Sequence, residues 1–436
     1  MSVLGLTGSR RTLRSAGAAA VATAIVVLAF GLQTNGSAAA TPSAASAAAP
    51  SWAKLFAKYV GAKVVGPANS KLAPVTVGWV NAQGGIVQSP ESTVSVNFAV
   101  SVINKYLGGV GGGHPLKLKE CFVVQSEAQG QACAQAFDNT PAVKFVLEGV
   151  MPFGSTGFMQ TNNGKLPVLG FNPVTASSAT GKNTYEVTSG LFGTDPGEIS
   201  YLTGVLHAKT VSLLYPQDDP AGVTAANLFQ QIAKTAGLTI TAVGFSSTAS
   251  DLLTPMTAAN AQATDASVVF FVNPAVCQAG AHATQQLNVK HVVALALCLD
   301  PAVQSGLGDY PAWTYVNTAE SANLPKADPN VAAWLTAIAA TAKKDPAVLA
   351  PFPELAFGTA LTAAKLINKI GAKKLSPATF KAAVLNYHGP SMFGPPNLKW
   401  GSVQGLPALG TTAVRLYTYL GKGKWQDATG GKWVGG

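Results

Sequence analysis

The segment VTVGWVNAQGGIVQSPE, residues 75–91, joins an apolar run to a glycine-rich loop and then to the tripeptide Ser-Pro-Glu. The apolar run predicts a buried strand over 75–80. Serine followed by proline is typical of a helix N-terminus, so a helix is predicted over 91–107. Such a terminus carries about half a positive charge, which suits an anionic ligand. A purely structural role for Ser89 and Pro90, as cap and first helical residue, explains the pattern equally well.

Strand-like and helix-like segments alternate along the rest of the chain. Continuous apolar runs such as VVFFV and VVALAL indicate strands covered on both faces of a sheet. This alternation predicts an α/β protein with two doubly wound, Rossmann-like lobes. The C-terminal RLYTYLGKGKW predicts a hairpin, and Val94, Phe98 and Val102 are expected on one face of the first helix. The predicted strands lie at 75–80, 117–124, 143–150, 166–171, 210–215, 239–245, 267–272, 291–297 and 313–317. The predicted helices lie at 91–107, 132–138, 329–343, 354–370 and 377–386, with others beginning near Pro220, Asp251 and Pro274.

The composition excludes general disorder and gives no sign of nucleic-acid binding. Of 436 residues, 48% are hydrophobic and 11% are charged, which indicates a large buried core and favours two domains. The formal net charge is +10, but the lysines lie singly or in pairs, without a basic stripe interleaved with aromatic residues. We expect no nucleic-acid partner, no cofactor and a monomer.

The N-terminus has the pattern of an export signal. The basic segment SRRTLR precedes an apolar run over 16–32, and Ala38 and Ala40 offer an A-x-A cleavage site. We therefore predict a cleaved signal peptide over 1–40, a linker or N-terminal extension over 41–73, and an extracytoplasmic location. The apolar run is short, which favours a removed signal over a membrane anchor. No cysteine lies near the cleavage site to carry a lipid.

Export changes the interpretation of the four cysteines, Cys121, Cys133, Cys277 and Cys298. In an oxidising compartment they are expected to form two disulfides rather than a zinc site, because no C-x-x-C motif and no suitably spaced histidine accompanies them. Three pairings are possible. We favour Cys121–Cys133 and Cys277–Cys298, because each pair brackets a single unit of one strand and one helix.

No local motif indicates catalysis. The glycine run GGVGGG follows a predicted helix and precedes a strand, whereas a dinucleotide fingerprint needs the reverse order. The five histidines are scattered, and the sequence has neither H-E-x-x-H nor a G-x-S-x-G nucleophile elbow. We therefore predict a protein that is not an enzyme.

Several segments together resemble a bacterial type I periplasmic binding protein. They are VTVGWVNAQGG, SPE plus a helix, the glycine turn before HPLKL, the two cysteine pairs, VLEGV, LPVLGFNPVT, VSLLYPQDD and ASVVFFVNP. Their order is most similar to the leucine/isoleucine/valine-binding (branched-chain amino acid) family of ABC-importer receptors, in its actinobacterial form. The resemblance implies two lobes joined by three hinge crossovers near 188–192, 317–321 and 395–400. It implies an N-terminal lobe of 74–190 and 319–396, and a C-terminal lobe of 191–318 and 397–436.

The resemblance also implies a ligand and a partner. A small amino acid or organic acid would be held in the cleft between the lobes and delivered to an ABC permease. The ligand's carboxylate would accept hydrogen bonds from backbone N–H groups of 153–155 and from the hydroxyls of Ser155 and Thr175. In amino-acid-binding relatives a second-lobe carboxylate meets the ligand's ammonium group, a role open here to Asp219 or Asp300. Each aspartate also precedes a proline and has an alternative role as a helix cap.

The predicted site lies in the polar loops at the carboxyl ends of the strands, where open α/β sheets bind ligands. Many of these loop residues have a structural alternative, because such residue types also make turns. Gly84 would let its loop approach the ligand, with Glu91 beside it at the rim. The complete predicted set is Gly84, Glu91, Phe153, Gly154, Ser155, Asn172, Thr175, Asp219, Asn273 and Asp300.

Some features depart from the family. Relatives that bind amino acids usually have a Tyr-Gly pair where this chain has Asp219-Pro220-Ala221-Gly222, and they often have a tyrosine near Asn273. The resemblance therefore does not determine the ligand or whether it carries an amine. A sensor or scavenger with the same fold is an alternative to a transport receptor, and a secreted hydrolase is a further one.

Overall fold

The structure is a computed structural model that describes residues 49–85, 87–320 and 328–435. The predicted signal peptide over 1–40, the beginning of the predicted linker and the end of the second predicted crossover lie outside these residues. Within the described ranges, no helix is both long enough and apolar enough to cross a membrane.

Five parallel strands form the first sheet. They are β1 (Val75–Ala82), β2 (Leu116–Val123), β3 (Val143–Glu148), β4 (Val168–Gly170) and β5 (Thr184–Glu186). Their spatial order is β2-β1-β3-β4-β5. Because every pair of neighbouring strands is parallel, all five strands end at the same edge of the sheet.

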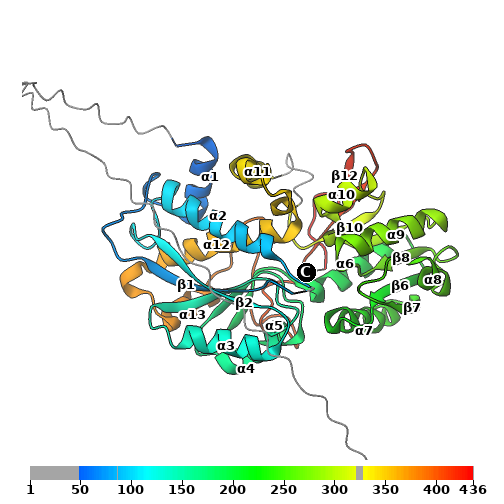
Figure 1. Cartoon of the computed structure of the whole chain (residues 1–436), viewed down its shortest axis with the longest axis horizontal. Helices are drawn as coiled ribbons and strands as arrows, with labels where there is room; N and C mark the ends of the chain where they lie inside the picture. Colours follow the sequence, from blue (N-terminus) through cyan, green and yellow to red (C-terminus); the bar gives the residue numbers. More distant parts are fainter. Residues whose placement is uncertain (1–48, 86, 321–327, 436) are drawn as a thin grey trace, which may run out of the picture. The chain divides into compact units, whose positions relative to one another are not determined.

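Helices cover both faces of this sheet, because alternate residues of its strands enter two separate cores. In β1, Val77 and Trp79 pack into one core and Val80 into the other. The first core includes α1 (Ser51–Val60), α2 (Pro90–Tyr106), α11 (Pro329–Ala342), α12 (Pro351–Ile370) and α13 (Pro377–Leu385). The second includes α3 (Glu127–Asp138) and α4 (Ser155–Asn162). Figure 1 shows α2 and α12 on one side of β1 and β2, with α3 and α4 on the other.

The segment predicted as a linker contains a helix that belongs to the first core. In α1, the side chains of Ala53, Phe56 and Val60 are buried. The Phe56 ring lies 5.4 Å, centroid to centroid, from the ring of Phe357 in α12. The amphipathic pattern of this segment therefore produces a packed helix, so its residues do not form a free linker.

Helix α2 packs against α12 through small side chains, while Val94 stays partly exposed. Val94 is 37% exposed, whereas Ser95 and Ala99 are fully buried. The Ser95 hydroxyl donates to the Pro353 carbonyl of α12 at 2.6 Å. Helix α2 therefore meets α12 through small side chains that allow a close approach.

Seven strands form the second sheet. They are β6 (Thr210–Pro216), β7 (Thr239–Phe245), β8 (Ala266–Val269), β9 (Val292–Leu295), β10 (Thr314–Asn317), β11 (Arg415–Tyr419) and β12 (Trp425–Asp427). Their order is β12-β11-β10-β9-β8-β6-β7. Strands β6 to β10 are parallel, and the predicted C-terminal hairpin adds β11 and β12 as antiparallel strands at one edge.

The second sheet is also covered on both faces. Leu213 of β6 packs into a core with α6 (Gly190–Gly204) and α7 (Pro220–Thr235). The next residue, Leu214, packs into a core with α8 (Leu253–Ala258), α9 (Pro274–Gln286) and α10 (Pro301–Leu307). The predicted fold class, two parallel-sheet lobes of the doubly wound type, is confirmed.

Several elements escaped prediction for local reasons. Helix α3 begins at Glu127 rather than at 132, because Ser126 and Gln129 form a capping box before it. Helix α6 contains Pro196, which is typical of a helix end rather than a helix interior. Helix α4 follows Gly154, whose φ of 74° lies in the left-handed region. The short strand β5 and helix α5 (Ala176–Thr180) were also missed.

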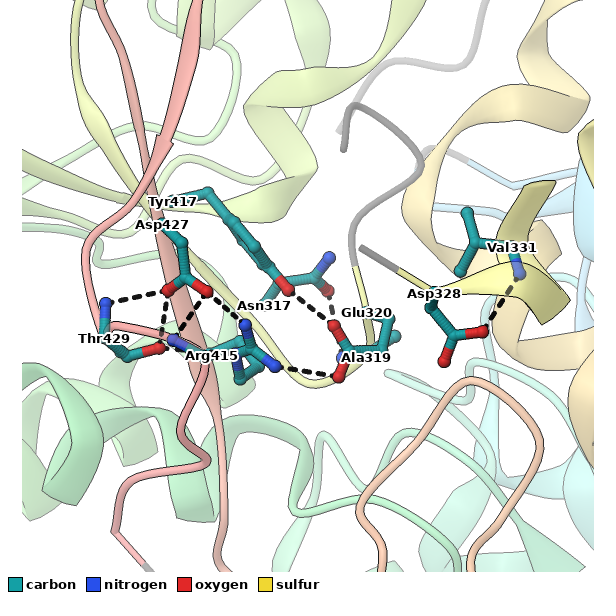
Figure 2. A network of polar contacts seen from close by, with 10 residues as sticks. Asn317, Ala319, Glu320, Asp328, Val331, Arg415, Tyr417, Asp427 and Thr429 are labelled. Atoms are coloured by element: carbon teal, nitrogen blue, oxygen red, sulfur yellow. Dashed lines mark hydrogen bonds and ion pairs between the residues drawn. The ribbon is translucent and has the colours of Figure 1, made fainter. Parts of the chain in front are cut away.

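The chain passes between the two lobes after β5, after β10 and before β11. A partly buried polar network around Arg415 lies at the second passage, and Figure 2 shows it. Arg415 Nη1 donates to Glu320 Oε1 at 2.8 Å, and Arg415 Nη2 donates to Asp427. Tyr417 donates to Glu320 Oε2 at 3.0 Å. The Glu320 N–H donates to the Phe393 carbonyl at 2.7 Å, which ties the second passage to the segment before the third. The lobe boundaries given above stay a prediction.

Two disulfides are present, with the predicted pairing. Cys121 is bonded to Cys133, and Cys277 to Cys298. The first joins the end region of β2 to α3, and the second joins α9 to the short 3-10 helix over Ala296–Leu299. Each bridge therefore lies within one lobe and leaves the passages between lobes unconstrained.

Candidate functional site

A cavity of about 390 Å³ lies at the carboxyl ends of strands from both sheets. From the first lobe it is lined by residues that follow β1, β3 and β4, and from the second by residues that follow β6, β8, β9 and β10. Parallel strands bring these loops to one edge of each sheet. The cavity is thus built where the sequence predicted a binding cleft.

Three acidic side chains line the cavity. Asp219 is the N-cap of α7, and its Oδ1 accepts from the Ala221 N–H at 3.0 Å. Asp300 is the N-cap of α10, and its Oδ1 accepts from the Ala302 N–H at 2.7 Å. Both aspartates therefore cap helices and face the cavity, so the two roles considered for them are compatible.

The third acid, Glu91, comes from the first turn of α2. Its Oε1 accepts from the Ser89 hydroxyl at 2.6 Å. That hydroxyl also bonds to the Ser92 hydroxyl at 2.6 Å and makes no cap bond to the backbone of α2. Helix α2 does begin at Pro90, but the predicted side-chain cap by Ser89 is absent because its hydroxyl holds Glu91 instead.

Burial in the cavity lining disfavours the ionised form of these three carboxyl groups. Burial raises the pKa of Glu91, Asp219 and Asp300 above the usual value of each. The charge of Asp300 further raises the pKa of Glu91, and the charge of Asp218 does so for Asp219. Hydrogen bonds from Ser89 and from backbone N–H groups oppose this rise.

The rest of the lining is apolar or neutral. Among the described residues, no lysine, arginine or histidine lines the cavity. The walls are formed by aliphatic and aromatic side chains from both lobes, including Val87, Val150, Leu191, Phe270, Leu297 and Phe352. These wall residues are not in the set predicted from the sequence. Most of them lie near strand or helix ends, but Phe352 comes from α12, far along the chain, and carries no local signal.

Two asparagines of the predicted set also line the cavity, and they differ in their bonding. Both ends of the Asn273 side chain are engaged: its Oδ1 accepts from the Val276 N–H at 2.9 Å and its Nδ2 donates to the Ser247 carbonyl at 2.9 Å. The Asn172 side chain is 8% exposed and has no hydrogen-bond partner among the described residues. Its amide is therefore available to a ligand.

Ser155 and Thr175 do not line the cavity. Their hydroxyls lie 2.9 Å apart and belong to a cluster with Ser177 and Ser178. The Ser178 hydroxyl donates to the buried carboxyl group of Glu148 at 3.0 Å. The two hydroxyls expected to bind a ligand carboxylate are thus engaged with each other and, through Ser178, with an acid of the protein itself.

The backbone donors expected beside Ser155 are also partly occupied. The Gly154 N–H donates to Glu127 Oε1 at 3.1 Å, and the Gly157 N–H donates to Glu127 Oε2 at 2.6 Å. A carboxylate of α3 therefore holds the N-terminus of α4. Phe153 and Gly154 do not line the cavity, whereas the preceding Pro152 does.

Gly84 lies outside the cavity lining. It is exposed, its φ of 90° requires glycine, and its N–H donates to Gln88 Oε1 at 2.7 Å. Gln88 itself lines the cavity. Of the predicted set, the structure therefore brings Glu91, Asn172, Asp219, Asn273 and Asp300 together and leaves the other five around the margin. Within the described residues, no cluster of histidine, cysteine and acidic side chains is arranged to hold a metal ion.

Comparisons with known proteins agree with this architecture. A family model described as periplasmic binding protein matches residues 74–406. No curated protein sequence matched the chain. Among solved structures, a fatty acid ABC transporter substrate-binding protein from Thermomonospora curvata matches with 16% identity and a TM-score of 0.65, covering 86% of this chain and 94% of its own.

Two further structures carry different ligands in the same fold. An ABC transporter solute-binding protein from R. palustris, in complex with 4-hydroxybenzoate, has 16% identity and a TM-score of 0.64, covering 81% of this chain and 95% of its own. A branched-chain amino acid transporter substrate-binding protein from Streptococcus pneumoniae, in complex with isoleucine, has 13% identity and a TM-score of 0.60, covering 81% and 98%. Likeness at this identity shows the fold, and the ligand has to be argued from the cavity.

Proposed function

Because the chain belongs to the periplasmic binding protein family, we propose that it is the extracytoplasmic solute receptor of an ABC importer. It binds a small organic molecule in the cavity between the lobes and presents the bound form to a permease in the membrane. The solute is bound without being converted, and the receptor acts as a monomer that needs no cofactor.

One observation carries this proposal: loops of both sheets line a single cavity. A ligand that contacts both lobes stabilises the closed arrangement, in which the lobes meet around it. A permease can distinguish this closed form from the empty form. The three passages between the lobes and the placement of each disulfide within one lobe are compatible with such a motion.

A screen of small solutes by thermal unfolding tests the proposal. A true ligand at about 100 times its Kd should stabilise the protein by about 2.7 kcal/mol. Mass spectrometry should recover that ligand unchanged after prolonged incubation. Release of a product would contradict the proposal, and so would a screen of amino acids, organic acids, amides and amines in which nothing stabilises the protein.

A further inference from the structure

We propose that the cavity binds an organic cation, an ammonium group on an apolar body, and that the ligand needs no carboxylate. This inference rests on the proposed function, because it specifies the ligand of the same cavity. It departs from the small amino acid or organic acid that the sequence resemblance implies.

The first argument is the charge of the lining. Glu91, Asp219 and Asp300 come from three different helices and face one cavity, and no basic side chain among the described lining residues balances them. Each carboxylate accepts only one or two hydrogen bonds from other described residues, whereas a carboxylate has about four acceptor sites. The lining therefore offers many acceptors and needs a donor, and an ammonium group supplies three.

The second argument concerns the helix N-termini that could bind an anion. Carboxyl groups of the chain itself occupy the N-termini of α7 and α10 at the cavity and that of α4 nearby, whereas the N-termini of α2 and α6 at the cavity have no side-chain cap. Glu127 holds the N-terminus of α4, Asp219 that of α7 and Asp300 that of α10. At α7 and α10 a carboxylate ligand would have to compete with Asp219 and Asp300. It would also be placed among three acids, where like charges repel.

The third argument comes from the remaining lining. Asn172 is more than nine-tenths buried, lines the cavity and has no partner among the described residues, so its amide oxygen is open to a further N–H donor. The walls of valine, leucine and phenylalanine suit an apolar body. The ammonium group of an alkylamine or arylalkylamine would donate to the acids and the amide, while its hydrocarbon part would contact the apolar walls. The cavity volume of 390 Å³ is within the usual range for small-ligand pockets.

The test uses the matched set of leucine, 3-methylbutylamine, which is leucine without its carboxylate, and 4-methylpentanoate, which is leucine without its amine. Phenylalanine, 2-phenylethylamine and 3-phenylpropanoate form a second, larger set. Isothermal titration calorimetry at pH 7.5 measures each affinity for the full chain. We expect the amine of at least one set to bind at least tenfold more tightly than its amino acid, and both acids to give no binding heat.

Variants assign the effect to the cavity. Asp219→Asn and Asp300→Asn remove charge but keep the cap, because asparagine caps helices as well as aspartate. Glu91→Gln is the third single variant. Each of the three should weaken amine binding at least tenfold. Asp251→Asn is the matched control, because Asp251 also accepts from a backbone N–H, that of Leu253, is exposed and does not line the cavity. It should leave the affinity unchanged.

The outcomes separate this inference from the proposed function. Tighter binding of an acid or an amino acid than of its amine would overturn the inference and leave the receptor function standing. Unchanged amine affinity in all three cavity variants would overturn it too. If no member of either set and no compound of the wider screen binds, both proposals fail.

Discussion

Two buried carboxyl groups, those of Glu148 at the end of β3 and Glu186 at the end of β5, lie on either side of β4 without a cationic partner among the described residues. Burial raises the pKa of Glu148 to about 7, although a hydrogen bond from Ser178 opposes the rise. Burial and the charge of Glu148 raise the pKa of Glu186 well above its usual value. Protonation of these groups therefore favours the folded protein.

The stability of the protein should consequently depend on pH in a defined direction. A carboxyl group whose folded pKa is raised binds more protons in the folded than in the unfolded state, so stability is lost as pH rises through the interval between the two values. For Glu148 that interval runs from about 4.5 to about 7. A shift of this size corresponds to roughly 3 kcal/mol.

Glu148→Gln tests this assignment. The variant removes the titrating group but keeps an oxygen that can accept from Ser178, so it should be more stable than the parent at pH 8 and little changed at pH 5. Thermal unfolding across this range measures the difference. Glu120→Gln, at an exposed position of β2, is the control and should leave the pH profile unchanged. An unaltered profile in Glu148→Gln would show that Glu148 ionises normally in the fold.

This residue-level chemistry explains why the predicted carboxylate site does not line the cavity. Ser155 and Thr175 are hydroxyl residues at the carboxyl ends of strands, the pattern that indicates a ligand site. A buried acid nearby also needs hydrogen-bond donors, and the serine cluster connects Ser155 to Glu148 through Ser178. Sequence alone cannot show which acceptor a hydroxyl meets, because Glu148 lies in a strand whose apolar neighbours predict only burial.

At the scale of elements, α1 has a role that its place before the first strand conceals. Phe56 is fully buried, with its ring 5.9 Å from that of Trp52 and 5.4 Å from that of Phe357, centroid to centroid. Truncation of a buried phenylalanine typically costs about 3–5 kcal/mol, through lost burial and the cavity that remains. Phe56→Ala should lower the free energy of unfolding by an amount in this range.

Lys54→Ala on the exposed face of α1 provides the control for this prediction and should change stability by less than about 0.5 kcal/mol. Chemical denaturation of both variants gives the comparison. A loss in Phe56→Ala no larger than that in Lys54→Ala would mean that α1 is detached from the core in solution.

The Arg415 network is the second element-scale feature with an energetic consequence. Arg415 is 4% exposed and is paired to Glu320, which lies where the chain leaves β10, and to Asp427 in β12. Burial raises the pKa of Glu320, while Arg415 and a hydrogen bond from Tyr417 lower it. Removing the arginine would leave two carboxylates without their cation, which typically costs about 3–5 kcal/mol.

Arg415→Met should therefore lower the free energy of unfolding strongly. Lys165→Met, which breaks an exposed ion pair, is the comparison that measures the effect of burial. Lys165 and Asp138 are also 2.8 Å apart, but the lysine side chain is 65% exposed. An exposed pair contributes at most about 1 kcal/mol. Urea unfolding of the two variants should give a several-fold difference in lost stability. Equal losses would show that the Arg415 network is solvated in solution.

At the scale of the whole molecule, the fold was more predictable than the site. Long apolar strands such as β1 and β6, and helices that begin at Ser-Pro or Asp-Pro, carry their signal within a few residues. Asp219 and Asp300 could be placed at the cavity because parallel strands fix where their loops gather. Phe352 could not, because its position depends on α12 returning to the first lobe after strands β6 to β10 of the second sheet.

The two-lobe cavity leads to a last prediction, on hydrogen exchange. A ligand in this cavity contacts segments of both lobes, so its binding should slow amide exchange in 87–91 of the first lobe and in 270–274 and 295–300 of the second. Mass spectrometry of the full chain, with and without 3-methylbutylamine or the solute found by screening, measures the change for each segment. Helix α8, which does not line the cavity, is the internal reference. Protection confined to one lobe would mean that the ligand contacts a single lobe. Such a ligand could not favour one arrangement of the lobes over another, so the physical basis for signalling through closure would be lost.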